Sequence, residues 1–272
     1  TVEVSKKIGI FPGLINAVLK NISSNKKELI KTTIEFNELP SWFTNKTKNL
    51  SQEDKKRFIN TFYKEPNLHL VFKNNFLLKG FRHDHKITSK LSAFVLGSKR
   101  IDELNGYSSG DWWVQDLSSM LPIYFCSEIS GKKVLDLCSA PGGKSFQSIS
   151  LGAEVYSNDI NSKKVKILET NLKRLNFKIK ISNKNALDLD TSKKYDYVLI
   201  DAPCSSVGTI RRNPEIYFKK QPPKINFLTS LQRKLLDKAS QLLRKNGTII
   251  FMVCSFLYEE TEAHINYFLK KN

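Results

Sequence analysis

Apolar positions in the second half of the chain alternate between short strand-like runs and helical stretches. The runs predict strands at Lys133–Cys138, Glu154–Asn158, Ile179–Ser182, Tyr195–Asp201 and Thr248–Cys254. The stretches between them predict helices at Gly143–Ile149, Ser162–Leu175 and Phe227–Leu243. Parallel strands need a crossover to return the chain, and a helix supplies it. The pattern therefore predicts an α/β domain, doubly wound, with helices on both faces of a parallel sheet.

The first part of the chain has a weaker pattern. Residues 8–22 carry apolar positions at helical spacing after Pro12, and the polar stretch Ser23–Lys31 then predicts a connector. A lysine-rich helix is predicted at Ser51–Tyr63, opened by a capping pattern in its first four residues, and a strand at Leu68–Phe72. The aromatic residues here have the spacing of a core more than of a base-stacking surface; they are Trp42, Phe43, Phe58, Phe62, Phe72, Phe76 and Phe81.

The change of pattern near residue 110 predicts three parts in this chain of 272 residues. Residues 1–35 are expected to be a leading helix with a linker, residues 36–109 a small α+β subdomain, and residues 110–272 the α/β domain. The first residue is Thr1 rather than Met, so we expect a fragment, with further edge strands of the sheet beyond residue 272. The apolar runs are far shorter than the roughly 18 residues that a membrane-spanning helix needs, so no span is predicted.

The charge balance changes the picture. The chain has 44 Lys and Arg against 26 Asp and Glu, a formal net charge of +18, which favours a polyanionic partner such as nucleic acid. The alternative is that abundant lysines only solvate ordinary surfaces, but the shortage of acids is then unexplained. A membrane surface is less favoured, because we find no basic amphipathic helix or lipidation motif.

The cysteines have no paired C-x-x-C spacing, and no secretory leader is seen, which predicts free thiols in a reducing cytoplasm. The four are Cys126, Cys138, Cys204 and Cys254. No metal site is expected, because the histidines lack zinc-ligand spacing relative to these cysteines. The histidines are His69, His83, His85 and His264.

A glycine-rich turn follows the first strand of the predicted sheet. Gly142 and Gly143 open a helix there, so that backbone N–H groups and the helix dipole can bind a carboxylate or phosphate. The turn is neither a G-x-G-x-x-G motif nor a P-loop. Asp159 ends the second strand, where a carboxylate can bind both ribose hydroxyls of an adenosine-containing ligand. The alternative for Asp159 is a cap on the helix Ser162–Leu175.

Two cysteines and a carboxylate lie at the ends of the fourth and fifth strands. Asp201 ends the fourth strand, Cys204 follows it, and Cys254 ends the fifth. Ligands of open α/β sheets bind beyond the carboxyl ends of the strands, so these side chains should meet in one crevice. A single cysteine at a strand end is more often a small buried hydrophobe, but two beside a carboxylate favour a functional site.

These residues resemble the Fmu/Sun family of RNA cytosine-5 methyltransferases, of the RsmB type. The likeness rests on CSAPGGK at 138–144, DAPCS at 201–205 and VCS at 253–255, and it covers nearly the whole chain. The stretches at 115–119 and 211–215 also resemble segments of that family. Residues 8–22 resemble the last helix of the NusB-like RNA-binding domain that precedes the catalytic part in the ribosomal-RNA branch.

The resemblance implies a Rossmann-like class I methyltransferase fold and S-adenosylmethionine as cofactor. Asp159 would hold the ribose of the cofactor, and Asn185 would lie near its adenine. The family usually has Asp where this chain has Asn185, so weaker cofactor binding is expected, and Asp188 is an alternative contact. The remaining cofactor contacts implied are Cys138, Ser139, Ala140, Pro141, Gly142, Gly143, Lys144 and Asp201.

The resemblance also implies a covalent mechanism. Cys254 would add to carbon 6 of cytosine, Asp201 would hydrogen-bond the ring, and Cys204 would assist release of the product. Lys144 would lie near Cys204 as its electrostatic partner. RNA, foremost small-subunit ribosomal RNA, is the expected substrate of a cytoplasmic monomer, with transfer RNA as an alternative.

Two other functions compete with this interpretation. An amino-methyltransferase would carry an Asn-Pro-Pro-Tyr type of motif where this chain has Asp-Ala-Pro-Cys at 201–204. A catalytically inactive RNA-binding or assembly protein is the third hypothesis, and the intact cysteines, carboxylate and glycine-rich turn argue against it.

Overall fold

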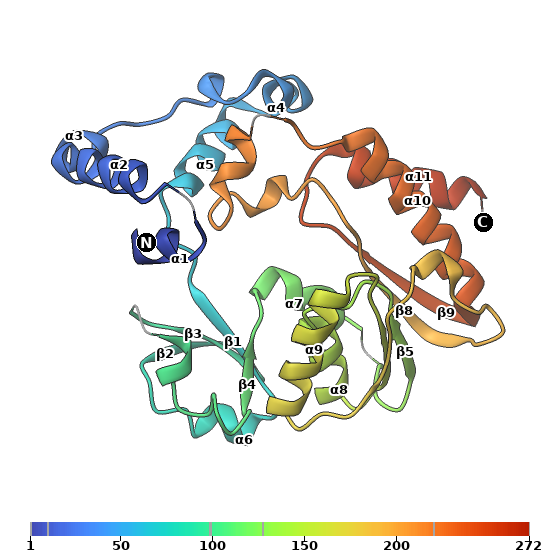
Figure 1. The fold of residues 1–272 in the computed structure, drawn as a ribbon. Coiled ribbons are helices and arrows are strands. Elements are labelled where there is room, and N and C mark those ends of the chain that lie inside the picture. The colour runs from blue at the N-terminus through green and yellow to red at the C-terminus, as the bar shows by residue number, and fades with distance from the viewer. Residues whose placement is uncertain (1, 10, 98–99, 127, 220, 272) are drawn as a thin grey trace. The chain divides into compact units, whose positions relative to one another are not determined.

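The structure is a computed structural model that describes residues 2–9, 11–97, 100–126, 128–219 and 221–271. The chain divides into two compact units, Thr1–Thr61 and Phe62–Asn272, and each is described by itself. The elements of both are labelled in Figure 1. The predicted boundaries at residues 36 and 110 concern the function of the parts and stay predictions.

The first unit is helical. The helix predicted over 8–22 is present from Pro12 onward, and a separate short helix precedes it. The connector predicted at Ser23–Lys31 is wrong, because α2 continues to Ser24 and a further helix follows, formed by good helix formers. The helices are α1 (Val2–Lys7), α2 (Pro12–Ser24), α3 (Lys26–Leu29), α4 (Ser41–Lys46) and α5 (Gln52–Phe62), with a 3₁₀ turn at Phe36–Glu38.

An aromatic cluster forms the core of this unit. The ring of Phe43 lies 5.8 Å from that of Phe36 and 5.2 Å from that of Phe58. The predicted capping pattern of α5 is confirmed, because the Ser51 hydroxyl accepts a hydrogen bond from the Asp54 N–H at 3.1 Å. This cap fixes where the helix that carries Phe58 begins.

The second unit contains a small antiparallel sheet with the strand order β2-β3-β1-β4. Only β1 was predicted, and the other three strands are short. Phe72 and Phe81 are buried as expected, but Phe76 is 82% exposed, because the short surface helix α6 turns Leu78 inward instead. The elements are β1 (Leu68–Phe72), α6 (Asn75–Lys79), β2 (His85–Ser89), β3 (Ser92–Val95) and β4 (Trp112–Val114).

The larger sheet has five parallel strands in the order β7-β6-β5-β8-β9, which confirms the predicted doubly wound α/β, Rossmann-like fold. The strands are β5 (Lys133–Asp136), β6 (Glu154–Asn158), β7 (Lys180–Ser182), β8 (Tyr195–Asp201) and β9 (Leu243–Met252). The helices are α7 (Leu117–Tyr124), α8 (Gly143–Ser150), α9 (Ser162–Arg174), α10 (Ile225–Leu242) and α11 (Glu262–Lys271). Short 3₁₀ turns lie at Ile101–Glu103, Ala186–Asp188, Val207–Thr209, Pro214–Phe218 and Tyr258–Glu260.

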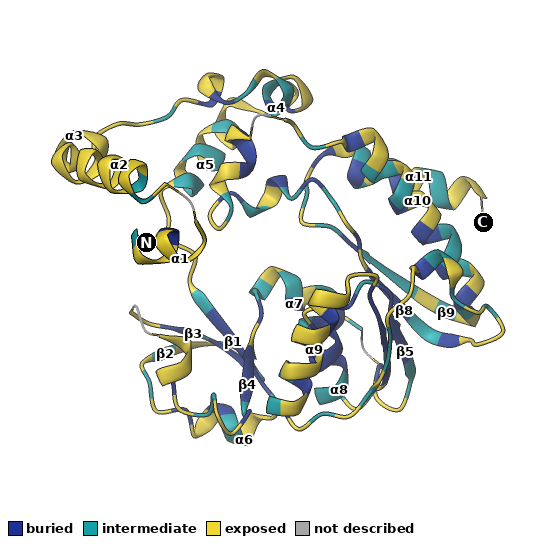
Figure 2. Ribbon diagram, viewed as in Figure 1, coloured by how far each residue is buried: buried dark blue, intermediate teal, exposed yellow. Residues whose placement is uncertain are grey.

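Alternate residues of β8 face opposite layers, as the strand period requires. Val198 and Ile200 pack in a cluster with Leu235 of α10, whereas Leu199 packs with Ile123 of α7. Figure 2 shows much of the central strands β5 and β8 as buried. Among the described residues, no helix has the length and apolar character needed to cross a bilayer. Because the five strands are parallel, their carboxyl ends meet at one edge, where the candidate site lies.

Candidate active site

A cavity of about 700 Å³ opens at the carboxyl ends of β8 and β9. Three predicted site residues, Lys144, Asp201 and Cys254, line it together. Cys204 is not among the lining residues, but it contacts Cys254 directly. Other polar residues of the lining come from α7, the segment after β8 and the start of α11; they are Asp116, Ser118, Ser119, Thr209, Arg211, Arg212, Ser255, Thr261 and Glu262.

The two thiols form a close pair. The sulfur atoms of Cys204 and Cys254 are 3.1 Å apart, and Cys254 Sγ lies 3.3 Å from the Ser206 hydroxyl. Hydrogen bonding from Cys204 lowers the pKa of Cys254 to about 6, against the opposing effect of burial. The pKa of Cys204 is raised, first by that same hydrogen bond and then by burial. At neutral pH the more exposed Cys254 is therefore the thiolate, and Cys204 stays protonated.

Lys144 and Asp201 form an ion pair at the edge of the same cavity. The Lys144 ammonium donates to Asp201 Oδ2 at 2.7 Å and to the Ser119 hydroxyl at 2.8 Å. The lysine side chain is 11% exposed and the aspartate side chain 44% exposed. Two acceptors thus fix the ammonium, while the carboxylate keeps a face toward the cavity.

The glycine-rich turn contains buried polar atoms without a protein partner. Ser139 Oγ and Asp136 Oδ1 are both buried and make no hydrogen bond, although Ser145 donates to the other oxygen of Asp136 at 2.7 Å. Burial raises the pKa of Asp136 to about 7 and that of the Cys138 thiol to about 12. Orphaned polar atoms at this turn fit a polar ligand held there.

Gly142 allows the turn to pack closely against the Phe146 ring. Its φ of +117° lies in the left-handed region, and an added Cβ would stand 2.1 Å from the Phe146 ring. The neighbouring residues are fixed by backbone contacts: the Ala140 N–H donates to Asp159 Oδ2 at 3.1 Å, and the Pro141 carbonyl accepts from Asn171. These contacts hold the turn from the end of β6 and from α9.

Asp159 and Asn185 lie at the carboxyl ends of β6 and β7 and do not line the cavity of the thiols. The N-cap of α9 is Asn161, not Asp159, which instead accepts the Asn161 N–H at 2.8 Å. Asn185 caps a 3₁₀ turn that contains Asp188, and both side chains are exposed. The structure therefore places Asp159 in contact with the glycine-rich turn, whereas Asn185 and Asp188 follow the edge strand β7.

Several contacts of the site could not be found from sequence. Asp116 caps α7 and forms an ion pair with Arg212 at 2.6 Å, and both line the cavity. The buried Gln115 side chain receives a hydrogen bond from Trp113 and donates to Gln147 of α8. Resemblance alone had marked the stretches 115–119 and 211–215, without indicating that they meet.

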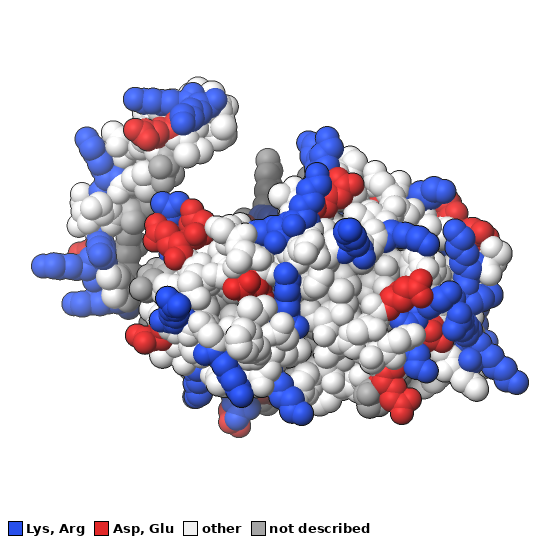
Figure 3. Space-filling model, turned by 90° about the horizontal axis from the view of Figure 1, so that it is seen from below, with Lys and Arg blue, Asp and Glu red and all other residues white. Residues whose placement is uncertain are grey.

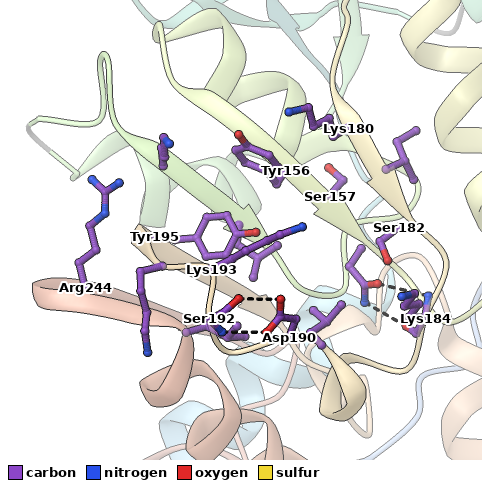
Figure 4. Close-up of a pocket in the computed structure, with 17 residues that line it drawn as sticks. Tyr156, Ser157, Lys180, Ser182, Lys184, Asp190, Ser192, Lys193, Tyr195 and Arg244 are labelled. Atoms are coloured by element: carbon purple, nitrogen blue, oxygen red, sulfur yellow. Dashed lines mark hydrogen bonds between the residues drawn. The ribbon is translucent and has the colours of Figure 1, made fainter.

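A second cavity, of about 530 Å³, lies on a face of the sheet between β5, β6, β7 and β8. Figure 4 shows Tyr156 and Tyr195 within it, with lysines at its margin. Lys180 stands 5.4 Å from the centre of the Tyr156 ring. This cavity contains none of the residues that the sequence predicted for the site. The candidate site is therefore assigned to the first cavity, because the thiol, carboxylate and ammonium groups lie there.

Basic side chains are spread widely over the surface. In the view of Figure 3, Lys and Arg outnumber Asp and Glu over much of the visible face. Within the described ranges, no group of three or more His, Cys, Asp or Glu side chains is arranged to hold a metal ion.

Comparison with known proteins places these residues in context. Residues 127–272 match the family model described as 16S rRNA methyltransferase RsmB/F. The chain is 29% identical to "Ribosomal RNA small subunit methyltransferase B" of Photorhabdus laumondii, over 99% of this chain and 67% of that protein. It is 30% identical to the protein of the same name in Salmonella dublin, over 100% of this chain and 68% of that protein.

A solved structure titled "Crystal Structure of PH0851" has a TM-score of 0.78 and 26% identity, covering 87% of this chain and 58% of that one. The chain thus spans about two thirds of the length of the curated relatives it matches.

Proposed function

The chain belongs to the 16S rRNA methyltransferase RsmB/F family, and from this premise we propose that it methylates carbon 5 of a cytosine in RNA, foremost small-subunit ribosomal RNA, using S-adenosylmethionine. The observation that carries the proposal is the contact of Cys204 with Cys254, 3.1 Å between sulfurs, beside Asp201. Direct transfer to an amine would have no use for two thiols at this point.

Cys254 is the proposed nucleophile. It is the thiol that lines the cavity, and the lowered pKa makes it a thiolate at neutral pH. Addition of the thiolate to carbon 6 of cytosine forms a C–S bond and makes carbon 5 nucleophilic. The target base must be unstacked or single-stranded to enter the cavity.

Asp201 and Lys144 are proposed to orient the base. The Asp201 carboxylate has a face open to the cavity and can accept from the exocyclic amine of cytosine, or bind its nitrogen 3 when that atom is protonated. Lys144 holds the carboxylate in place at 2.7 Å. Cys204 then removes the proton from carbon 5 as the C–S bond breaks, which restores the aromatic ring and frees Cys254.

The residues present fit the cofactor. The orphaned Ser139 Oγ and Asp136 Oδ1 offer polar contacts, and Gly142 forms the tight turn at the start of α8. The proposed contacts are Cys138 to Lys144 along the turn, Asp159 for the ribose hydroxyls, Asn185 near the adenine, and Asp201. When bound, S-adenosylmethionine supplies an electrophilic methyl group.

We expect Asp159→Ala to weaken binding of S-adenosylhomocysteine about tenfold or more. Two charge-assisted hydrogen bonds to the ribose, of roughly 1.5–3 kcal/mol each, would be lost, and about 1.4 kcal/mol corresponds to tenfold. Isothermal calorimetry measures this directly. Asn161→Ala, which removes the neighbouring helix cap, is the control for local loosening and should bind nearly as the parent does. Equal affinity of Asp159→Ala and the parent protein would contradict the ribose assignment.

RNA binding should weaken steeply as salt is added, because a chain with a net charge of +18 is expected to contact phosphates. For single strands, the logarithm of the affinity falls with the logarithm of salt concentration with a slope of about −0.7 per phosphate neutralised. Fluorescence anisotropy with a labelled RNA over a salt series gives the slope. A slope near zero would show that the lysines only solvate the surface.

The direct test of the function is methyl transfer from labelled S-adenosylmethionine to RNA, followed by analysis of the nucleosides. Label in 5-methylcytidine supports the proposal, and label in a methylated amine of adenine contradicts it. Bisulfite sequencing of RNA from cells with and without the protein would locate the cytosine.

The first part of the chain is proposed to belong to a NusB-like RNA-binding domain, with residues 36–109 as a second RNA-binding part. In support, α2 exposes apolar side chains along its length and buries none, as expected of a helix that has partners elsewhere. Those side chains are Leu14, Val18, Leu19 and Ile22. We further propose a monomer that acts in the cytoplasm.

A further inference from the structure

Each cysteine of the pair is followed by a serine, and the two serines also meet. Cys204 precedes Ser205 after β8, and Cys254 precedes Ser255 after β9. The Ser205 and Ser255 hydroxyl oxygens are 3.2 Å apart, close to the 3.1 Å between the two sulfurs. The relative position of the two loops therefore determines both contacts.

A buried glutamate outside the cavity lining is hydrogen-bonded to these loops. Glu260 has no exposed surface and is not part of the cavity lining. Its carboxylate accepts hydrogen bonds from the Ser205 N–H at 2.9 Å and from the Ser205 hydroxyl. It also accepts from the Gln232 amide at 3.1 Å. Ser255 is linked in through Ser205, so one carboxylate connects the loop of each cysteine.

Gln232 and His264 fix the glutamate in turn. The amide nitrogen of Gln232 donates to Glu260 and also to the Pro203 carbonyl at 2.8 Å. With both of its N–H groups used, Gln232 can contact His264 only through its oxygen, which lies 2.6 Å from Nε2. His264 Nε2 is thus the donor, and burial lowers the pKa of this histidine, which favours its neutral form. The donor and the acceptor are therefore fixed in each hydrogen bond that links His264, Gln232 and Glu260.

We propose that Glu260 is a positioning residue for the thiol pair, holding the loops of Cys204 and Cys254 at the separation where the sulfurs touch. The inference deepens the proposed function and rests on it for its relevance to catalysis. Glu260 has no hydrogen bond to either sulfur and does not line the cavity, so its effect on the thiols passes through Ser205 and Ser255.

The thiol contact depends on this separation, and the acidity of Cys254 depends on the thiol contact. Hydrogen bonding from Cys204 is the largest cause of the lowered pKa of Cys254, with Ser206 as a further donor. If the loops separate, burial and the nearby Asp201 charge remain, and both raise the pKa. The other charged groups of the same cavity are Lys144, Asp116, Arg211, Arg212 and Glu262.

The experiment measures the pH dependence of Cys254 alkylation by iodoacetamide, resolved by peptide mass spectrometry, without RNA or cofactor. The parent protein should show a midpoint near pH 6. Glu260→Ala should move the midpoint upward by about one pH unit or more, which leaves at least about fivefold less thiolate at pH 6.

Glu260→Gln is the conservative variant and should keep a midpoint close to that of the parent protein, because its amide oxygen still accepts the Ser205 N–H and its amide nitrogen can donate to the Ser205 hydroxyl. Glu169→Ala, at an exposed glutamate of α9, is the matched control and should leave the midpoint unchanged.

An unchanged midpoint in folded Glu260→Ala would overturn the proposal. An equal shift in Glu260→Ala and Glu260→Gln would also overturn it, because the effect would then follow the charge and not the hydrogen bonds. If Glu260→Ala does not fold, Ser205→Ala replaces it; this variant keeps the carboxylate and removes the link to Ser255, and it should raise the midpoint by a smaller amount. No shift in Ser205→Ala would then overturn the inference.

A methylation assay on the same variants distinguishes a failure of the positioning role of Glu260 from a failure of the proposed methyltransferase function. A fall in kcat for Glu260→Ala, with KM for RNA unchanged, supports positioning for catalysis. A shifted alkylation midpoint in a protein that never methylates RNA would support the positioning of the thiols and contradict the proposed function.

Discussion

Cys254→Ser is expected to abolish both methyl transfer and any covalent adduct between the protein and RNA. A serine hydroxyl is a far weaker nucleophile than a thiolate without a dedicated base, and the nearest candidates do not supply one. Ser206 is itself a hydroxyl, and Asp201 is paired with Lys144 at 2.7 Å. The loss should reach the detection limit of a labelled-methyl assay and leave cofactor binding unchanged.

The acidity of Cys254 adds a pH dependence to the same prediction. Because the pKa of Cys254 is lowered to about 6, the thiolate is present above that pH and is lost below it. Adduct formation by the parent protein should therefore decline as the pH falls through about 6. Cys126→Ser, at a cysteine packed behind β5 and β8, is the control and should remain active. Residual turnover in Cys254→Ser would remove this thiol from the nucleophile role.

The strands that carry the site could be predicted from sequence because each is an apolar run bounded by polar residues. β6 and β8 match their predicted ranges, and the turn before α8 follows from its glycines. The start of β9 could not be predicted. Leu243 pairs with Tyr195, and a register shift then brings Thr248 opposite Tyr197, so pairing with β8 and not periodicity decides where the strand begins.

The small antiparallel sheet was mostly missed for a related reason. β4 has three residues, which is too short for a period of two to be recognised, and it exists because Trp113 pairs with Val71 of β1. The aromatic pattern predicted a core there, but it could not indicate that the short helix α6 leaves Phe76 at the surface.

Within the site, residues at strand ends could be predicted, and residues that meet only in the folded chain could not. Asp201 ends β8 and Cys254 lies two residues beyond Met252, the end of the adjacent β9, so topology alone brings them together. Ser119 contacts Lys144 across 25 positions, and Glu260 contacts Ser205 across 55. A serine in a helix or a glutamate before one has no local pattern that distinguishes such a contact from an ordinary solvated side chain.

Cys204→Ser is expected to behave differently from Cys254→Ser, because it should trap a covalent protein–RNA species. Cys254 keeps its thiol, and a serine hydroxyl at position 204 is still a hydrogen-bond donor toward it, so the C–S bond can form and carbon 5 can accept the methyl group. Removal of the carbon 5 proton then has no competent base, since the serine hydroxyl is much less acidic than a thiol and does not act as a base at neutral pH. The band should survive denaturing electrophoresis and disappear after ribonuclease treatment.

The order of events follows from how the two thiols influence each other. The first cause of the raised pKa of Cys204 is its hydrogen bond to Cys254, and that cause disappears once Cys254 becomes a thioether in the adduct. Burial still raises the pKa of Cys204, but the effects of Cys254 are gone, so the Cys204 thiol loses its proton more easily after the adduct forms than before. The double variant Cys204→Ser, Cys254→Ser should show no band. A band in Cys254→Ser and none in Cys204→Ser would reverse the roles, and full turnover in both would exclude covalent catalysis by these cysteines.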